Sequence, residues 1–478
     1  MPRKYANKQD TDQFRQILLS MEDQFLHLTP MDLCDKTKLL QDCLGAFKDN
    51  MKGFNVVEDI IRKGLKGEVF GPETIGHQIC LHLKKINREA KLLQAALDGK
   101  ATHQEKRHLI YDLGIRGRAP LSVADYISRY DAGDTSVRIV WRTRDATPCI
   151  KVRTWMSDIR GMEGTGEAVV DEEMGFYTVA PAENVIFLSG TRECPKLELV
   201  VFHGIGEGSE LTADLYKWLN AVIDYACWAR RDVRPYHEGN LTQIGMNLGP
   251  RHARVLGWAK SFVKNLSNKD MKIHDTDAIG AVSIFWSILS AYAPTEVTDA
   301  MVKYVEEEEL PHLATQNVGP GTGFRLCLGD KDYMFPTCSR APPEAYISCG
   351  YSAPVHRDAS YCPWAASWIV NRNVDNVDDS ADKSAGSSFV DVGLRVAVRA
   401  ASASLVIWNP NNAHGTTRSY GAENSGIAIT FSSKVCDVYR TLTSMGKVPF
   451  LSGTCYGGDE ILGLVESGSG AGATETDE

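Results

Sequence analysis

Two short segments of the sequence hold residues that could bind a metal ion. The first contains His356 and Asp358, which are separated by one residue. Residues two apart in an extended strand point to the same side, so both can chelate one ion. The second contains His414, which follows the apolar run 405–408 and a Pro/Asn turn, a place at the edge of a sheet. Two imidazoles and one carboxylate leave three coordination positions open, as in non-haem Fe(II) oxygenases.

The spacing alone is weak support, because a polar strand end and an unrelated turn histidine would look the same. Other motifs fit the chain less well. His-Arg-Asp also occurs in kinase catalytic loops, but Pro363 stands where such a loop needs Asn, and no Asp-Phe-Gly follows. The glycine-rich stretch 319–323 lacks the Gly-Lys-Ser/Thr of a phosphate-binding loop. The metal site therefore remains the leading hypothesis.

The pattern of apolar residues predicts the elements that must position this site. Apolar residues recur at three- and four-residue spacing within 10–110, within 211–231 and within 277–308, which indicates helices. Short runs rich in Val, Ile and aromatic residues, separated by Gly, Asp or Pro, indicate strands within 123–205 and from about 313 onward. Both metal-binding segments lie among these later strands.

We expect four regions along the chain. They are a helical, locally basic region 1–122, a mixed α/β region 123–240 packing on the core, a strand-rich core 241–450 with a flexible polar insert 373–388, and an acidic, disordered tail 451–478. The tail has six acidic residues and no Lys or Arg.

Composition excludes some classes of protein and leaves others open. The formal net charge of −9 argues against a uniformly basic nucleic-acid binder. However, residues 1–120 hold 20 Lys and Arg against 16 Asp and Glu. This local basic excess could contact nucleic-acid phosphates, or it could be a solvated helix face. The polar start of the sequence and the lack of any apolar run of about 18 residues lead us to expect neither a signal peptide nor a membrane span. The twelve cysteines include no Cys-x-x-Cys, so we expect reduced intracellular thiols and no structural zinc.

Roughly residues 245–445 resemble the TET/JBP family of DNA-base dioxygenases, in particular its compact fungal TET-like members. The most specific pieces are Tyr-Ser-Ala-Pro-Val-His-Arg-Asp at 351–358 and Ala-His-Gly-Thr at 413–416. The resemblance implies an α+β protein with a double-stranded β-helix (jelly-roll or cupin-like) core behind the helical N-terminal extension. It also implies His356, Asp358 and His414 as ligands of Fe(II), with 2-oxoglutarate and O₂ as co-substrates.

The family has an arginine at the start of the last core strand, which holds the far carboxylate of 2-oxoglutarate. This sequence has Ser425 at about that place. A buried carboxylate still needs a cation with several donors. We expect Arg418, four residues after His414, as the first candidate for this cation and Arg372 as the second. The alternative for each is an ordinary surface arginine. The departure also leaves room for another co-substrate.

The usual activity of the family, oxidation of the methyl group of 5-methylcytosine, implies a double-stranded methylated DNA partner and a nuclear location. N6-methyladenine is a second candidate substrate. A flipped base must be stacked on apolar or aromatic groups. Phe431, Tyr361 and Trp364 are candidates for this role, with core packing as the alternative, foremost for Trp364. Lys84, Lys85, Arg88 and Lys91 are candidates for backbone contacts. Two other functions stay open: the same chemistry on a protein or small molecule, and a non-enzymatic binding module.

Overall fold

The structure, a computed structural model, describes residues 120–206, 210–248, 255–259, 262–315, 317–318, 324–328, 331–335, 341–377, 382–444 and 455–457. The expected helices of 10–110 and nearly all of the acidic tail lie outside these residues. The described part is a mixed α+β fold built on large sheets, as the sequence predicts. None of its helices has the length and apolar character that a membrane span needs.

The largest sheet of the described part has ten strands in the order β1-β5-β6-β15-β12-β17-β11-β7-β8-β18. These strands are β1 (Arg138–Trp141), β5 (Val185–Gly190), β6 (Pro195–Phe202), β15 (Ser404–Trp408), β12 (Ala365–Asn373), β17 (Glu423–Ile429), β11 (Glu344–Ser352), β7 (Glu238–Asn247), β8 (Val255–Trp258) and β18 (Cys455–Gly457). The central strands β15, β12, β17, β11 and β7 pair antiparallel with their neighbours.

A second sheet has four strands in the order β16-β13-β14-β4. They are β16 (His414–Thr416), β13 (Phe389–Asp391), β14 (Val396–Val398) and β4 (Tyr177–Val179). Two smaller pairs accompany these sheets: β2 (Met156–Ser157) with β3 (Ala168–Val169), and β9 (Phe324–Leu328) with β10 (Lys331–Phe335). The four-stranded sheet carries His414 at its β16 edge, so this sheet sets the position of one metal-binding side chain.

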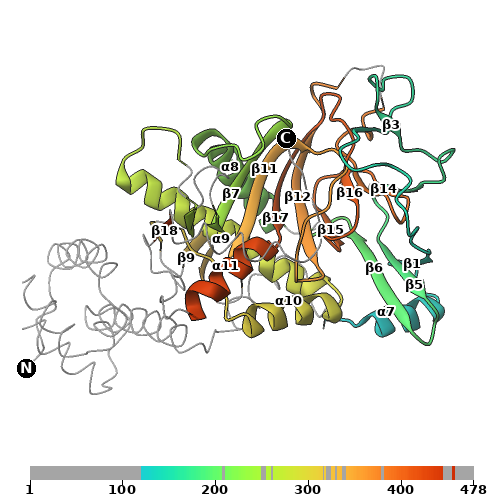
Figure 1. Ribbon diagram of the computed structural model, residues 1–478, viewed down its shortest axis with the longest axis horizontal. Coiled ribbons are helices and arrows are strands. Elements are labelled where there is room, and N and C mark those ends of the chain that lie inside the picture. Colours follow the sequence, from blue (N-terminus) through green and yellow to red (C-terminus); the bar gives the residue numbers. More distant parts are fainter. Residues whose placement is uncertain are drawn as a thin grey trace, which may run out of the picture. The chain divides into compact units, whose positions relative to one another are not determined.

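In the described part of the chain, five helices accompany the sheets: α7 (Val123–Asp131), α8 (Glu210–Ala229), α9 (Asn268–Tyr292), α10 (Thr295–Glu307) and α11 (Ser433–Ser444). α8 contacts β7, β11, β12 and β17, and α9 packs on α8. Figure 1 shows α8 and α9 on one side of these long strands and the strands β14 and β16 on the other. The helix predicted for 277–308 is two helices, because Pro294 cannot continue α9 and instead precedes the first turn of α10.

Local signals explain where two of the helices begin. Ser122 caps α7: its hydroxyl accepts from the backbone N–H of Asp125 (3.1 Å), and its own N–H donates to the Asp125 carboxylate (2.8 Å). Ser267 caps α9 with its hydroxyl alone, which accepts from the N–H of Asp270 (3.2 Å). Each cap satisfies backbone donors that the first helical turn leaves without partners.

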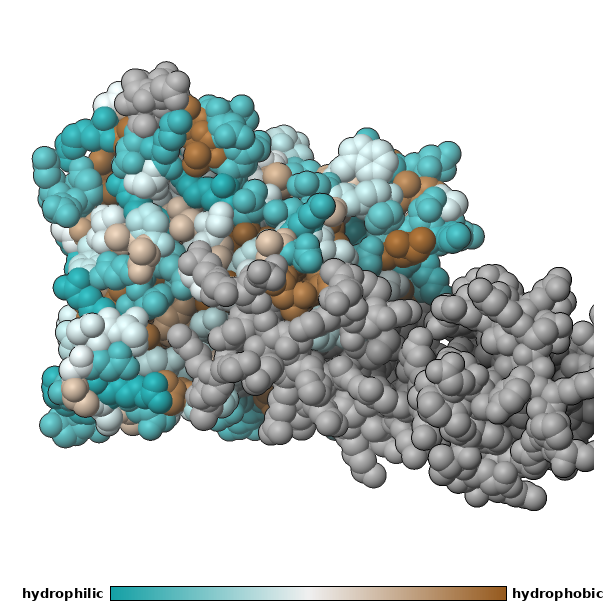
Figure 2. All heavy atoms as spheres, turned by 180° about the vertical axis from the view of Figure 1, so that it is seen from behind, coloured by the Kyte–Doolittle hydropathy of each residue, from teal (hydrophilic) through white to brown (hydrophobic). Residues whose placement is uncertain are grey.

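The two faces of the large sheet bury different cores. Trp368, Ile427 and Ile429 face α8 and α9 in the main core, whose partners include Phe285 and Leu289. On the opposite face Ala365 and Val406 pack with Val396 and Val398 of the four-stranded sheet. Strand alternation sends neighbouring side chains to opposite faces. Figure 2 shows one outer face of the molecule, which is mostly hydrophilic with scattered apolar residues.

Candidate metal centre

His356 and His414 are held beside each other by backbone pairing at the β16 edge of the four-stranded sheet. After β11 ends at Ser352, the chain crosses to the four-stranded sheet and runs antiparallel to β16. The N–H of His356 donates to the carbonyl of His414 (2.8 Å), and the N–H of His414 donates to the carbonyl of His356 (3.0 Å). Directly paired residues point to the same side of a sheet. The two imidazole rings therefore lie together, with centroids 4.4 Å apart.

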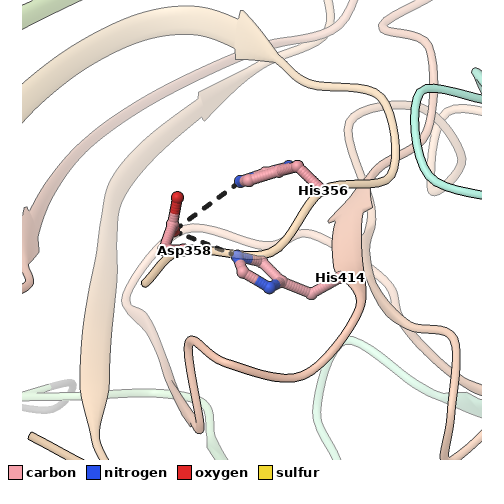
Figure 3. Close-up of side chains that lie close together, drawn as sticks. All are labelled: His356, Asp358 and His414. Carbon is pink, nitrogen blue, oxygen red and sulfur yellow. Dashed lines mark ion pairs between the residues drawn. The ribbon is translucent and has the colours of Figure 1, made fainter. Parts of the chain in front are cut away.

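Asp358 completes the group of three residues that we call the triad. Its N–H donates to the carbonyl of Pro410 (2.9 Å), which fixes the chain two residues beyond His356. One carboxylate oxygen lies 3.8 Å from Nε2 of His356 and 3.5 Å from Nε2 of His414. Figure 3 shows the two rings turned toward this carboxylate. The three ligand atoms all lie within 4.8 Å of one another, and no other group of three such residues occurs in the described part of the chain.

The far nitrogen of each ring is fixed by the backbone. Nδ1 of His356 lies 2.8 Å from the carbonyl oxygen of Pro354, and Nδ1 of His414 lies 2.8 Å from that of Asn412. A carbonyl oxygen only accepts, so each Nδ1 carries the proton of the neutral ring. The lone pair is then on Nε2, the atom that faces Asp358. This is how backbone partners orient metal-binding histidines.

The protonation states of His356 and Asp358 also suit a metal ligand. Desolvation, reinforced by the neighbouring His414, lowers the pKa of His356 to about 4, so its ring is neutral near pH 7. Burial acts to raise the pKa of Asp358, but its interactions with the neighbouring His414 and His356 outweigh burial and leave the pKa lowered. The side chains of His356 and Asp358 are nevertheless 37% and 42% exposed. The site is therefore surrounded by protein on most sides and open to solvent on one.

Aromatic side chains support the triad from behind. The rings of Trp408 and Phe389 lie 5.5 and 6.0 Å from the ring of His414, whose side chain is 4% exposed. Trp408 ends β15 and Phe389 begins β13, so each sheet contributes one ring. This packing limits the rotation of His414 and keeps water from its rear face.

The donor set fits a divalent transition-metal ion. Nitrogen and oxygen donors bound to one such ion at about 2.0–2.2 Å lie at most about 4.4 Å apart. Both separations between the Asp358 carboxylate and the imidazoles fall within that limit. Two imidazoles and one carboxylate on one side of an ion would leave the solvent side for other ligands. These three side chains thus form a donor set that a divalent metal ion could bind.

The structure places Arg418, the first expected carboxylate anchor, in a network of its own. Its Nε donates to Glu167 (2.8 Å) and its Nη1 to Glu238 (2.8 Å), while the guanidinium lies 3.7 Å from the ring centre of Trp155. Two carboxylates already match its single positive charge. An additional anion at this arginine would have to displace one of them.

Arg372, the second expected anchor, is bonded to neutral groups. Nη1 donates to the carbonyl of Gly386 (3.1 Å) and to the side chain of Asn424 (2.9 Å), and Nη2 donates to the carbonyls of Lys383 (3.2 Å) and Ala385 (2.5 Å). These bonds tie the end of β12 to the second half of the expected flexible insert. Arg372 thus has a structural task, and its role toward a co-substrate stays a prediction.

The three residues expected to stack a base lie in different surroundings. Phe431 is 1% exposed in the main core, where its ring meets Tyr304 at 5.0 Å, and Trp364 is 8% exposed in the same core. Tyr361 is 52% exposed and donates to Asp437 of α11 (3.1 Å). Phe431 and Trp364 therefore pack in the core, which is the alternative to stacking on a base. The basic group Lys84, Lys85, Arg88 and Lys91 lies outside the described residues, so its role stays a prediction.

Sequence reasoning missed polar and aromatic residues that surround the triad on the side of β7 and β11. Tyr351 donates or accepts a hydrogen bond at Nδ1 of His237 (3.0 Å), and the ring of His237 meets Trp155 at 5.8 Å. Arg234 acts electrostatically on both His356 and Asp358. The one signal in the sequence is the polar, aromatic stretch 234–238 directly before a strand, and it has no motif spacing.

Comparison with known proteins adds little to this geometry. No family model matches the sequence, and no curated protein does. A solved structure described as NgTET1 in complex with 5mC DNA matches with a TM-score of 0.31 and 9% sequence identity, over 55% of this chain and 85% of that chain. A similarity of this size shows neither family nor function.

Proposed function

We propose that the protein is an Fe(II)- and 2-oxoglutarate-dependent dioxygenase with His356, Asp358 and His414 as its iron ligands. The observation that carries this proposal is the triad itself: two Nε2 atoms and one carboxylate oxygen within 4.8 Å of one another, open to solvent on one side. Two histidines and one carboxylate on one face are the donor set of non-haem Fe(II) oxygenases, in which co-substrate and O₂ take the remaining positions.

The strand order supports a double-stranded β-helix, the core that the sequence resemblance implies. Successive strands alternate between the two sheets: β11 is in the large sheet, residues 353–356 pair with β16 in the small one, and β12 returns to the large sheet. β13 and β14 are in the small sheet, β15 in the large, β16 in the small and β17 in the large. Such alternation winds the chain around two facing sheets, with the triad at one end.

In this proposal the chain's own groups hold, orient and shield. The two imidazoles and the Asp358 carboxylate would hold the ion, and the carbonyls of Pro354 and Asn412 fix the rings. The face of the large sheet that looks toward the small sheet has little side-chain bulk at Ser367, Gly426 and Ala428, and a small co-substrate would lie there. When bound, the iron would supply O₂ activation coupled to decarboxylation of 2-oxoglutarate.

For the substrate we propose the methyl group of 5-methylcytosine in double-stranded DNA, with N6-methyladenine as the second candidate. The support is the sequence resemblance to the TET/JBP family at 351–358 and 413–416. An enzyme that oxidises a base must take it out of the duplex, which suits a metal site open on one side. A chromosomal substrate would place the protein in the nucleus. The alternative is the same chemistry on a protein or small molecule, consistent with the net charge of −9.

Mass spectrometry of nucleosides tests both parts of the proposal. Methylated duplex DNA is incubated with the protein, Fe(II), 2-oxoglutarate and O₂, with Asp358→Ala as the control. We expect oxidised cytosine bases and succinate with the wild-type chain and neither with the variant. Succinate without base oxidation would remove DNA as the substrate and keep the oxygenase. No succinate in the presence of any tested substrate, together with no 2-oxoglutarate binding, would refute the oxygenase itself.

A further inference from the structure

One four-residue turn, 409–412, follows β15. The N–H of Asn412 donates to the carbonyl of Asn409 (3.1 Å), and the N–H of Asn411 donates to the side-chain oxygen of Asn409 (3.0 Å). Pro410 occupies the second position, where its restricted backbone angle favours a turn. These two bonds and the proline fix the shape of the turn, so the groups that it presents to its neighbours have fixed positions.

Backbone carbonyls of the turn 409–412 hold both ligand-bearing segments. The carbonyl of Pro410 accepts from the N–H of Asp358 (2.9 Å), and the carbonyl of Asn412 accepts from Nδ1 of His414 (2.8 Å). A metal ion needs its carboxylate and imidazole donors at a fixed separation. Both donors depend on this one turn for their positions.

The side chain of Asn411 adds a direct link from the turn to the segment that follows Asp358. Its Oδ1 accepts from the N–H of Ser360 (3.2 Å), and its Nδ2 donates to the carbonyl of Ser360 (2.9 Å). Two reciprocal bonds fix the separation and the orientation of the joined segments. Ser360 is only 9% exposed, so water has little access to replace them. The bond from Arg357 to the Asn411 carbonyl (2.8 Å) lies at the exposed surface, where water can replace it.

The carboxylate of Asp358 depends on this link more than the two imidazoles do. Within the described residues its oxygens have contacts with Nε2 of His356 and of His414, and with no other side chain. Each imidazole, in contrast, is also held at its own Nδ1 by a backbone carbonyl. The position of the carboxylate is therefore set by the backbone around Asp358, which the bonds at Pro410 and Ser360 hold.

We propose that Asn411 is a positioning residue of the metal centre: its amide holds Ser360, and through it the Asp358 carboxylate, at the distance from the imidazoles that a bound ion needs. The inference rests on the metal centre of the proposed function. Asn411 itself is not a ligand, since both ends of its amide are already bonded to the backbone. Partners that orient a metal ligand without touching the ion change metal affinity by about tenfold to a hundredfold.

A double-mutant cycle of metal affinities tests this role without turnover. Co(II) is titrated into the wild type, Asn411→Ala, Asp358→Ala and the double variant. Co(II) binds nitrogen and oxygen donors more tightly than Fe(II) or Mn(II), so its affinity stays measurable after one ligand is lost. We expect Asn411→Ala to weaken Co(II) binding by about tenfold or more. In the Asp358→Ala background the same change should have no further effect, as expected when one residue acts through the other.

Asn184→Ala is the matched control for a loss of stability alone. Asn184 also bridges two backbone groups with both ends of its amide: it accepts from the N–H of His203 (2.7 Å) and donates to the carbonyl of Ser136 (3.2 Å). We expect urea unfolding to show that both asparagine variants fold and lose some stability, because each frees two backbone groups. Only Asn411→Ala should also lose Co(II) affinity.

The outcomes separate this inference from the proposed function. Wild-type protein that does not bind Co(II) would refute the metal centre and with it the proposed function. Wild-type Co(II) affinity in Asn411→Ala would overturn the inference and leave the function standing. An equal loss of affinity in Asn184→Ala would show a general effect of stability and overturn the inference. The same would follow if Asn411→Ala weakened binding by an equal factor in the Asp358→Ala background, because Asn411 would then not act through Asp358.

Discussion

Within the described residues the triad offers three donor groups and no further one beside them, so a neighbour cannot replace one that is lost. Asp358 is 42% exposed and has no hydrophobic packing task, so its removal should leave the fold intact. We expect Asp358→Ala to lower Mn(II) affinity by at least a hundredfold and to abolish turnover, with an unchanged circular dichroism spectrum. Arg357→Ala is the matched control: it lies between the two ligands but bonds the carbonyl of Asn411 (2.8 Å), away from the ion. Tight Mn(II) binding by Asp358→Ala would contradict the triad.

Glu344, at the start of β11, is a buried carboxyl group with an incomplete set of partners. It is 2% exposed, one oxygen accepts from the N–H of Ser432 (3.1 Å), and the other has no partner in the described part of the chain. Burial raises its pKa to about 8, so the folded protein keeps the proton near pH 7. The unfolded chain loses that proton above about pH 4.5. The contribution to stability is therefore complete below pH 4.5 and decreases as the pH rises toward 8.

Glu344→Gln should remove this dependence, since an amide has a similar shape and never ionises. We expect the variant to be more stable than the wild type by on the order of 5 kcal/mol at pH 8.5, at about 1.36 kcal/mol per pKa unit. The difference should shrink toward pH 5. Urea unfolding at several pH values measures it. A difference that does not change with pH would show that Glu344 is not buried in its protonated form.

At the scale of elements, β7 and β11 are brought together by two glycines. Gly239 and Gly350 face each other at the irregularity in the pairing of these strands, both with positive φ (+72° and +63°). A Cβ added at Gly239 would lie 2.2 Å from the carbonyl carbon of Gly350, which is closer than any real contact. This close approach positions Tyr351, the next residue on β11, beside His237.

Gly239→Ala should therefore lower the stability by more than the strain of its backbone angle alone. A non-glycine residue in the left-handed region costs about 1–2 kcal/mol, and the clash adds to it. Gly133→Ala is the matched control, because Gly133 has φ +93° and nothing within 4 Å of the added Cβ. We expect urea unfolding to show a larger loss of stability for Gly239→Ala than for Gly133→Ala. Equal losses would show that the strands can separate at no cost.

The insert 373–388 shows how element contacts refine a prediction from composition. Its polar sequence predicts that residues 374–387 can be deleted. However, Ser387 and Ser388 are 3% and 0% exposed, and Asp158 accepts from the hydroxyl of Ser388 (2.6 Å). We expect deletion of 378–382, replaced by two glycines, to leave the melting temperature within a few degrees. Deletion of 383–388 should lower it strongly, because it removes partners of both Arg372 and Asp158. Similar melting temperatures would show that the whole insert is dispensable, as its composition predicts.

Sequence periodicity predicts best the elements that are amphipathic or apolar over their whole length. The helix predicted over 211–231 is α8, and the apolar run 405–408 lies within β15. The segment 149–155 is also predicted as a strand. In the structure it consists of bends and a turn, with Arg153 at φ +72°, and a strand begins only after it, at Met156. Its N–H donates to the carbonyl of Val355 (2.6 Å), a partner two hundred residues away. A local sequence pattern holds no information on such a contact, and for the same reason it indicates the triad but not the contact of Tyr351 with His237.

At the scale of the whole molecule, the charge is divided unevenly between the parts of the chain. The net charge is −9 overall, yet residues 1–120 carry four more basic than acidic groups. An acidic body should repel DNA, so an enzyme acting on DNA requires basic groups that offset the repulsion. The nine Lys and Arg within 84–118 are the densest such group in that region. This arrangement would let one part of the chain hold the duplex while the triad reacts with a base.

The salt dependence of DNA binding tests whether the basic segment 84–118 holds the duplex. Each phosphate bound by Lys or Arg releases counterions, so the logarithm of the binding constant falls with the logarithm of salt concentration with a slope of about −0.9 per phosphate. We expect replacement of Lys84, Lys85, Arg88 and Lys91 by Glu to weaken binding to all sequences and to flatten the slope by about 0.9 for each phosphate that is no longer bound. Replacing Lys269 and Lys272, in the first turns of α9, with Glu changes the charge elsewhere and is the control. If the slope is unchanged by the first set, the segment is a solvated helix face and the duplex is held by another part of the chain.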